Sequence, residues 1–257
     1  MHQKVEAEGI SFGQPYLEDV ETLNRWAIEP KLDVTKLSFH ALAYVLDDYC
    51  LLSAGSALGR GCGPLLVSAG PIEPAELVRK KVAIPGRYTT AAFLFRLFLP
   101  DCTDVVEMRF DNIMEAVKTG AVDAGVIIHE SRFTYEGLGL VCLRDLGDWW
   151  EETTNFPIPL GCIAARRSLG SDKVEQIDRA IRASVKWGHA NPDLAMVYIR
   201  DHAQELSQDV IGSHVKLYVN DFSQDLGDGG MLAIDHFLKM GRESGILPDT
   251  DRGFKCK

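Results

Sequence analysis

The sequence has 257 residues, of which 46% are hydrophobic and 25% are charged, and its net charge is −10. A chain of this length folds into one large or two modest domains. The acidic balance disfavours a nucleic-acid partner, which requires a basic face, and also docking on anionic membranes. The most apolar window, residues 91–99, is short and contains Arg96, so we expect no membrane-spanning segment.

The six cysteines have wide, irregular spacing, and several lie in apolar runs such as Val141-Cys142-Leu143. This pattern favours free buried thiols in a reducing compartment over disulfides or zinc ligands. The N-terminal residues are polar and acidic and lack the apolar core of a signal peptide. We therefore expect a cytoplasmic protein. The cysteines are Cys50, Cys62, Cys102, Cys142, Cys162 and Cys256.

The first elements suggest an anion site. Residues 17–29 predict an amphipathic helix, because large apolar residues recur there at helical spacing. Residues 32–38 then predict a strand and residues 39–47 a helix. The segment Lys36-Leu37-Ser38 lies at their junction, where the start of a helix attracts an anion.

A glycine-rich stretch occupies residues 50–70 and leads into a short strand at residues 64–68. Its Gly59-Arg-Gly-Cys-Gly63 run precedes a strand instead of following one, so a dinucleotide-binding loop is disfavoured. Two readings remain open. The stretch is either a flexible turn or a cleft wall where the backbone approaches a ligand closely.

A second junction follows a predicted strand at residues 81–84. Pro85-Gly86 and Arg87 lead to Thr89-Thr90 and then to the apolar helix 91–99. A threonine at a helix start is commonly only a cap. The alternative is a carboxylate- or phosphate-holding site made by the helix amides, the two hydroxyls and Arg87. Both readings stay open.

Strands and helices alternate through the middle of the chain, which predicts a parallel α/β arrangement. From residue 171 onward the pattern is helical, and residues 247–257 predict an irregular tail. The predicted strands are 105–110, 122–129, 138–144 and 162–166, and the predicted helices are 111–118, 145–154, 173–189, 192–203, 210–219 and 231–241.

His129 is the best candidate for chemistry. It ends the apolar run Gly125–Ile128, and in parallel α/β sheets ligands lie just beyond the carboxyl ends of strands. A histidine there can serve as a general base if its pKa is near or below about 7. The plainer reading is a polar residue that caps a strand. No histidine, aspartate or glutamate cluster has metal-ligand spacing, so we expect no metal.

The strand-like stretches 64–68 and 160–166 bracket the central αβ block, and we interpret them as two crossings between lobes. Residues 69–163 would then form an inserted second lobe. Residues 1–68 plus 164–257 would form lobe one with a helical C-terminal layer. This is the two-lobed α/β architecture of periplasmic-binding proteins, which have a cleft between the lobes and close by hinge motion.

Six strings in this sequence are distinctive. They are Leu17-Glu-Asp-Val-Glu-Thr-Leu-Asn-Arg-Trp26, Thr35-Lys-Leu-Ser38, Ser56-Ala-Leu-Gly-Arg-Gly-Cys-Gly-Pro64, Ile128-His-Glu-Ser-Arg-Phe-Thr-Tyr135, Pro159-Leu-Gly161 and Tyr218-Val-Asn-Asp-Phe-Ser223. They closely resemble one family, the 1,4-dihydroxy-6-naphthoate synthases of menaquinone biosynthesis by the futalosine route. The resemblance runs from about Gly9 to about Gly245, and the string that begins at Ile128 is the most specific.

The resemblance implies a type II periplasmic-binding-protein fold used for catalysis in the cytoplasm, without a cofactor. It implies a carbon–carbon lyase that converts cyclic dehypoxanthinylfutalosine, a small carboxylate, to 1,4-dihydroxy-6-naphthoate. His129 would be the catalytic base, and the ligand would contact Lys36, Leu37, Ser38, Thr89 and Thr90. A monomer or homodimer is expected. Family members usually begin with a further strand and a Ser-Pro-Cys-Pro-Asn-Asp-Thr-like segment, and we expect this sequence to start after it.

Two alternatives remain. Chorismate dehydratase, the sister enzyme, shares the fold and the pathway, although the string after Ile128 favours the synthase. A non-catalytic solute-binding protein for a small carboxylate would also have this fold, although the expected free cysteines oppose it. In the synthase, Arg132 and Lys36 could hold the naphthoate carboxylate, and the reading in which Arg132 at a strand end only covers the sheet is nearly as well supported.

Overall fold

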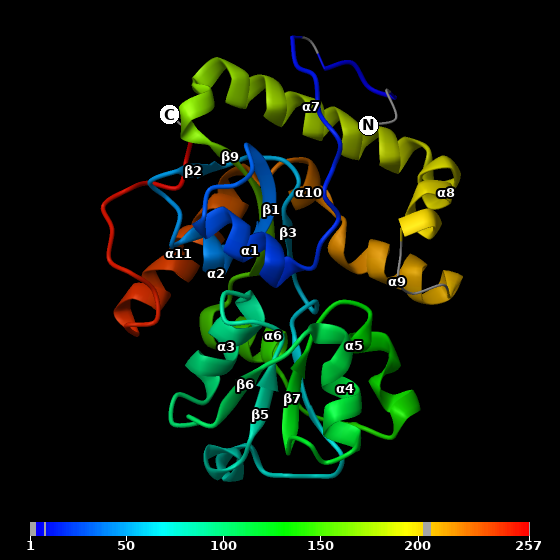
Figure 1. Ribbon diagram of the computed structural model, residues 1–257, viewed down its shortest axis with the longest axis vertical. Coiled ribbons are helices and arrows are strands. Elements are labelled where there is room, and N and C mark those ends of the chain that lie inside the picture. The colour runs from blue at the N-terminus through cyan, green and yellow to red at the C-terminus, as the bar shows by residue number, and fades with distance from the viewer. Residues whose placement is uncertain (1–3, 8, 203–206, 257) are drawn as a thin grey trace.

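The computed structural model describes residues 4–7, 9–202 and 207–256. It contains two sheets, each with its own helices, which form two lobes (Figure 1). We call the lobe of the first sheet, with the helices within residues 20–42 and 171–243, the first lobe, and the lobe of the second sheet, with the helices within residues 90–154, the second lobe. Within these described residues, no helix is both long and apolar enough to cross a membrane. The two-lobed α/β expectation is confirmed.

The first sheet is antiparallel throughout. Its central strand β9 (Ile158–Arg166) pairs with β1 (Val34–Ser38), β2 (Tyr49–Leu51) and β3 (Ala57–Gly59). β2 and β3 lie in the stretch that the sequence predicts as glycine-rich turns. They form because β9 is long enough to pair with three short strands at once.

The second sheet is only partly parallel, which corrects the prediction of a parallel arrangement. Its strand order is β6-β5-β7-β4-β8, and β4 runs antiparallel to both of its neighbours, while the other four strands run in one direction. β4 starts at the crossing from the first lobe, while β7 ends there, so these neighbours must run in opposite directions. The strands are β4 (Leu65–Ser68), β5 (Val82–Ile84), β6 (Val105–Glu107), β7 (Ala124–Ile127) and β8 (Val141–Asp145).

The helices cover both sheets, and most lie close to their predicted ranges. The α-helices are α1 (Val20–Ile28), α2 (Phe39–Leu42), α3 (Thr90–Phe98), α4 (Phe110–Lys118), α5 (Ser131–Thr134), α6 (Leu146–Thr154), α7 (Ser171–Ala190), α8 (Pro192–His202), α9 (Gln208–Tyr218), α10 (Asp221–Gln224) and α11 (Gly227–Glu243). The 3-10 helices are η1 (Pro74–Arg79), η2 (Tyr135–Leu138) and η3 (Arg167–Leu169). The end predicted for α8 at residue 203 lies outside the described residues.

Two helices differ from their predicted ranges for local reasons. α1 starts at Val20 and not at Leu17 because the side chain of Asp19 accepts hydrogen bonds from the amides of Glu21 and Thr22, as an N-cap does. α2 ends at Leu42, far short of the prediction, because the chain then turns to bring β2 beside β9.

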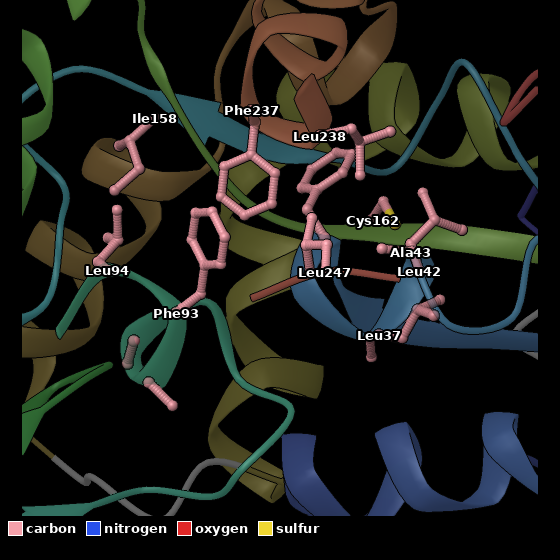
Figure 2. Packing of buried hydrophobic residues seen from close by; sticks show 14 of the residues in the cluster. Leu37, Leu42, Ala43, Phe93, Leu94, Ile158, Cys162, Phe237, Leu238 and Leu247 are labelled. Atoms are coloured by element: carbon pink, nitrogen blue, oxygen red, sulfur yellow. The ribbon is translucent and has the colours of Figure 1, made fainter. Parts of the chain in front are cut away.

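One hydrophobic core extends across both lobes. It contains Leu37 and Cys162 of the first sheet together with Val82 and Val126 of the second. Figure 2 shows its centre, where Phe93 of α3 faces Phe237 of α11, and their ring centroids are 4.2 Å apart. The shared core fixes the start of α3 against the first lobe.

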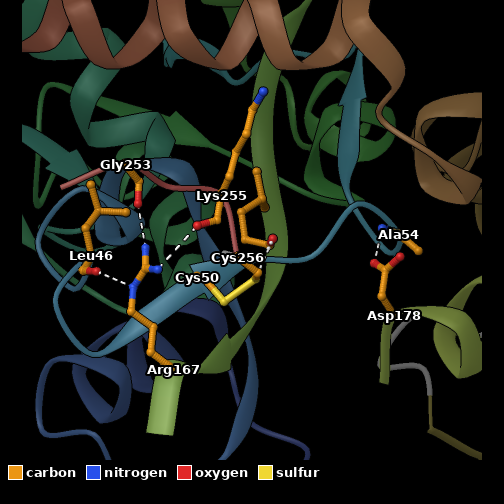
Figure 3. The surroundings of a disulfide bond; sticks show 9 residues. Leu46, Cys50, Ala54, Arg167, Asp178, Gly253, Lys255 and Cys256 are labelled. Carbon is orange, nitrogen blue, oxygen red and sulfur yellow. Dashed lines mark hydrogen bonds between the residues drawn. A yellow bond between two sulfur atoms is a disulfide. The ribbon is translucent and has the colours of Figure 1, made fainter. Parts of the chain in front are cut away.

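The cysteine prediction is wrong for one pair, because Cys50 and Cys256 form a disulfide (Figure 3). The C-terminal tail returns beside β2, where the amide of Leu51 donates to the carbonyl of Phe254. Arg167 holds this tail through the carbonyls of Gly253 and Lys255. Of the other cysteines, Cys142 is exposed, while Cys62, Cys102 and Cys162 are free and buried as expected.

The chain crosses between the sheets twice. Strands within residues 65–145 belong to the second sheet, and residues 158–166 belong to the first. The backbones of the first crossing and α6 touch at Gly63 and Gly147, where a Cβ on Gly63 would lie 2.2 Å from the Cα of Gly147. The predicted lobe boundaries, 1–68 plus 164–257 and 69–163, stay a prediction.

Candidate active site

A cavity of about 120 Å³ lies between the lobes. Its lining includes Lys36, Ser38, Thr89, Thr90 and His129, so the structure brings together five of the six residues that the sequence predicts. The other lining residues are Val20, Ala57, Cys62, Pro64, Ala91, Ile128, Leu160, Gly161, His214 and Tyr218. The sixth, Leu37, is fully buried in the core, where it pairs with Cys162 of β9.

A larger hollow of about 340 Å³ lies on the second lobe beside η1 and β8, and it is more open. It contains none of the predicted site residues. The inter-lobe cavity is the better candidate because it collects several titratable groups whose pKa values are shifted.

His129 follows the buried strand β7 and is fixed by an unusual backbone. The strand ends at Ile127, and His129 adopts a left-handed conformation with φ of 57°. Residues other than glycine rarely adopt this region, although histidine and asparagine are enriched there. Such strain is characteristic of functional positions. The edge of the Phe110 ring contacts the imidazole, with the centroids 5.2 Å apart.

The imidazole of His129 is neutral at pH 7. Burial, followed by the charge of Lys36 and the neighbouring His214, lowers its pKa from 6.5 to about 3. Within the described part of the chain, neither ring nitrogen makes a hydrogen bond. A neutral imidazole with a free nitrogen can accept a proton from a bound molecule.

His214 and Tyr218 are cavity residues that the sequence analysis missed. Both lie on α9, and the ring of His214 is 6.2 Å from that of His129 and 4.5 Å from that of Tyr218. Burial and then Lys36 lower the pKa of His214 to about 4. Their spacing of four residues places both side chains on one helix face. This spacing was the signal in the sequence that could have identified them as a pair.

Lys36 supplies the cavity with an unpaired positive charge. Its side chain keeps an accessible surface, which opens into the cleft. The surrounding protein nevertheless removes much of the water around the ammonium, and this desolvation lowers its pKa. No carboxylate lines the cavity, and Lys36 has no salt bridge within the described chain. A desolvated, unpaired cation favours an anionic ligand.

The predicted hydroxyls, by contrast, are bonded within the protein. Ser38 caps α2 and donates to the carbonyl of Tyr88. Thr89 caps α3, donating to the carbonyl of Gly86 and accepting from the amide of Ala92. Thr90 donates to the carbonyl of Leu160, 2.8 Å away. Thr90 and Ala91, in the first turn of α3, line the cavity, and the amides of a first helical turn have no partner within their helix.

His40 supports the start of α3 by a hydrogen bond to the N-cap residue Thr89. It is fully buried, and its Nδ1 donates to the carbonyl of Thr89 at 3.0 Å. Burial lowers its pKa from 6.5 to about 4, so this histidine is also neutral at pH 7. Its Nε2 atom is buried without a partner.

Neither candidate arginine is free to hold a ligand. Arg132 forms a salt bridge with Asp145 at 2.5 Å and also donates to the carbonyl of Gly63. Arg87 lies over the ring of Tyr88 and does not line the cavity. Lys36 therefore remains as the cation for a carboxylate.

Comparison with solved structures shows the fold. A crystal structure of a protein from Archaeoglobus fulgidus has a TM-score of 0.85 and 40% identity, and the match covers 90% of this chain and 86% of that one. The alkanesulfonate-binding protein SsuA from Xanthomonas axonopodis has a TM-score of 0.66 at 13% identity, covering 90% and 81% of the two chains. The periplasmic-binding-protein-like fold is confirmed.

Sequence relatives show the family. A 1,4-dihydroxy-6-naphthoate synthase from Thermus thermophilus is 50% identical over 239 residues, which are 93% of this chain and 87% of the relative. One from Streptomyces coelicolor is 44% identical over 251 residues, covering 94% and 88%. The profile described as menaquinone biosynthesis matches residues 9–243. With its cavity, its fold and these relatives in agreement, the chain belongs to the menaquinone biosynthesis family, as its resemblance to the 1,4-dihydroxy-6-naphthoate synthases predicts.

Proposed function

We propose that this protein is a cytoplasmic 1,4-dihydroxy-6-naphthoate synthase, a carbon–carbon lyase that acts on cyclic dehypoxanthinylfutalosine without a cofactor. The observation that carries the proposal is the pairing of a neutral, unbonded His129 with the unpaired cation Lys36 in one cavity. The first group can take a proton, and the second can hold the substrate carboxylate.

The bound substrate would be oriented by its carboxylate. Lys36 would bind this group, and the free amides of Thr90 and Ala91 add a partly positive helix start on the same cavity. Ser38 and Thr89 would serve the ligand indirectly, because their hydroxyls hold the loops that form the cavity. Leu37 would contribute to the site indirectly, because its buried side chain helps to hold β1, which carries Lys36 and Ser38.

The reaction would begin at His129. The imidazole takes a proton from the substrate, the released electron pair moves toward the conjugated ring, and the carbon–carbon bond to the sugar portion breaks. The ring becomes the aromatic naphthoate. Each of these steps needs only a base, an anchor for the carboxylate and an acceptor already present in the substrate.

Substrate entry requires the cleft to widen. The cavity volume of about 120 Å³ is smaller than the roughly 300–1,000 Å³ of ordinary ligand pockets. Proteins with this architecture open and close their cleft by hinge motion.

Turnover of defined substrates tests the proposal. Purified protein should convert cyclic dehypoxanthinylfutalosine to 1,4-dihydroxy-6-naphthoate, detected by chromatography and mass spectrometry. Chorismate, the substrate of the sister dehydratase, should remain unchanged. Dehydration of chorismate would instead indicate the sister activity. Tight binding of the futalosine derivative without turnover would indicate a solute-binding protein.

A further inference from the structure

The product of the proposed reaction carries a hydroxyl group where a ring oxygen has accepted the electron pair. Negative charge therefore develops on this oxygen as the carbon–carbon bond breaks. Enzymes stabilise such an oxyanion with preorganised hydrogen-bond donors in a site shielded from water. His129 is the base and Lys36 the carboxylate anchor, so the oxyanion needs a different group.

Tyr218 has the properties of that donor. It lines the cavity, and burial raises the pKa of its hydroxyl well above the ordinary value, which keeps the phenol protonated. Among the residues that the structure describes, its hydroxyl has no hydrogen-bond partner. A protonated, unbonded hydroxyl in a cavity is free to donate to a ligand.

Tyr218, His214 and His129 are neighbouring rings along the cavity. The ring centroid of His214 lies 4.5 Å from that of Tyr218 and 6.2 Å from that of His129. Lys36 lines the same cavity of about 120 Å³ from β1. A ligand that fills this cavity therefore contacts Tyr218 as well as His129 and Lys36.

The position of Tyr218 is fixed by contacts on both sides. Tyr218 ends α9, and its ring contacts that of His214 at 4.5 Å. Directly after it, Asn220 caps α10 and donates to the carbonyl of Leu58, while Ser223 donates to that of Ser56. This junction ties α9 to the loop that forms another wall of the cavity, so the hydroxyl is held before any ligand arrives.

We propose that the Tyr218 hydroxyl donates a hydrogen bond to the oxyanion that forms on the substrate ring. This inference rests on the proposed function. His214 is a positioning residue that holds the ring of Tyr218. The proton balance needs no further reactant, because the proton that His129 removes is returned to the ring oxygen, directly or through one water. Tyr218 itself stays protonated throughout.

The test is Tyr218→Phe, which keeps the ring and deletes only the hydroxyl. We expect kcat to fall by about 10²–10³-fold with little change in KM, the effect of removing one oxyanion donor. Thermal unfolding should match the parent, because the hydroxyl has no partner among the residues that the structure describes. Tyr16→Phe is the matched control, since Tyr16 is exposed and packs on Trp26 outside the cavity.

A binding measurement separates this inference from the proposed function. The absorbance of bound 1,4-dihydroxy-6-naphthoate reports ionisation of its hydroxyl, and a donor to the anion lowers the pH at which ionisation occurs. In Tyr218→Phe we expect that pH to rise relative to the parent. Parental kcat in Tyr218→Phe would overturn the inference while leaving the proposed function intact. If the parent itself lacks turnover, the proposed function fails. In that case the role of Tyr218 is tested by binding alone, and it would be overturned if the bound product ionised at the same pH in Tyr218→Phe as in the parent.

Discussion

The polar groups of the cavity fall into two sets that differ in whether they already have partners. The bonded set is Ser38, Thr89 and Thr90, whose hydroxyls are satisfied by the protein. The unbonded set is Lys36, His129, His214 and Tyr218, whose side chains make no hydrogen bond or ion pair within the described residues. The first set maintains the shape of the cavity, and the second is available to a ligand.

The difference is informative because a satisfied hydrogen bond stabilises the fold by about 0.5–1.5 kcal/mol, whereas a group without a protein partner adds no such bond. The four side chains of the unbonded set line one cavity and keep accessible surface, so a ligand can bind them without first breaking a contact within the protein. Substitution in the unbonded set should reduce activity, and substitution in the bonded set should reduce stability.

The largest effect should come from His129→Asn. Asparagine tolerates the left-handed backbone at this position, so the variant removes the basic nitrogen without adding strain. We expect kcat to fall by about 10²–10⁴-fold, the usual contribution of a general base, while substrate binding is retained. His189→Asn is the control, because His189 is exposed on α7. Parental turnover by His129→Asn would contradict the assignment of the base.

Low pH should destabilise the fold because it protonates His40. This histidine is bonded to the carbonyl of Thr89, a residue of the bonded set. Its pKa is about 4 in the folded state and about 6.5 when unfolded. Its stabilising contribution is complete above pH 6.5 and is lost as the pH falls toward 4. The loss is about 3 kcal/mol at most, by linkage. Denaturant unfolding of His40→Gln should show a flatter dependence on pH in this window, and an equally steep dependence would refute the assignment.

Lys36→Met should weaken binding without harming the fold. Loss of a charged contact of about 1.5–3 kcal/mol corresponds to a roughly 10–150-fold rise in KM. The free energy of unfolding should stay the same or increase, because a desolvated cation is removed. Lys31→Met is a suitable control, since Lys31 is paired with Glu29 on the surface. A KM that Lys36→Met leaves unchanged would argue against the anchor.

Thr90→Val should give the smallest effect and the opposite pattern. It deletes the hydrogen bond to the carbonyl of Leu160 and keeps the backbone amide of residue 90 at the start of α3. We expect the free energy of unfolding to fall by about 1 kcal/mol, with KM nearly parental. If instead KM rises and stability is unchanged, the Thr90 hydroxyl belongs to the ligand and not to the bonded set.

Local sequence patterns were sufficient for much of the site. The apolar run of β7 ends beside His129, and the junctions at Ser38 and Thr89 carry cap residues at helix starts. These signals depend on neighbours in the chain, so single-sequence reasoning can find them. Whether the hydroxyls of Ser38 and Thr90 also bind a ligand could not be predicted, because their partners are the carbonyls of Tyr88 and Leu160, far away in sequence.

Distant pairings account for what the sequence analysis missed. His214 reaches His129 only because α9 is anchored to the loop before β3, through Asn220 and Ser223. The antiparallel pairing of β2 and β3 depends on β9, more than a hundred residues later in the chain. The Cys50–Cys256 bond joins residues 206 positions apart, with no local pattern at either end.

That bond also makes the molecule a covalent ring from residue 50 to residue 256. A protease that cuts once anywhere between these positions yields two fragments that remain joined through sulfur. Such nicked protein migrates as a single species on a non-reducing gel and separates only after a thiol reductant is added. Limited proteolysis followed by gels run with and without a reductant therefore reveals cuts that an activity assay or size-exclusion chromatography would not detect.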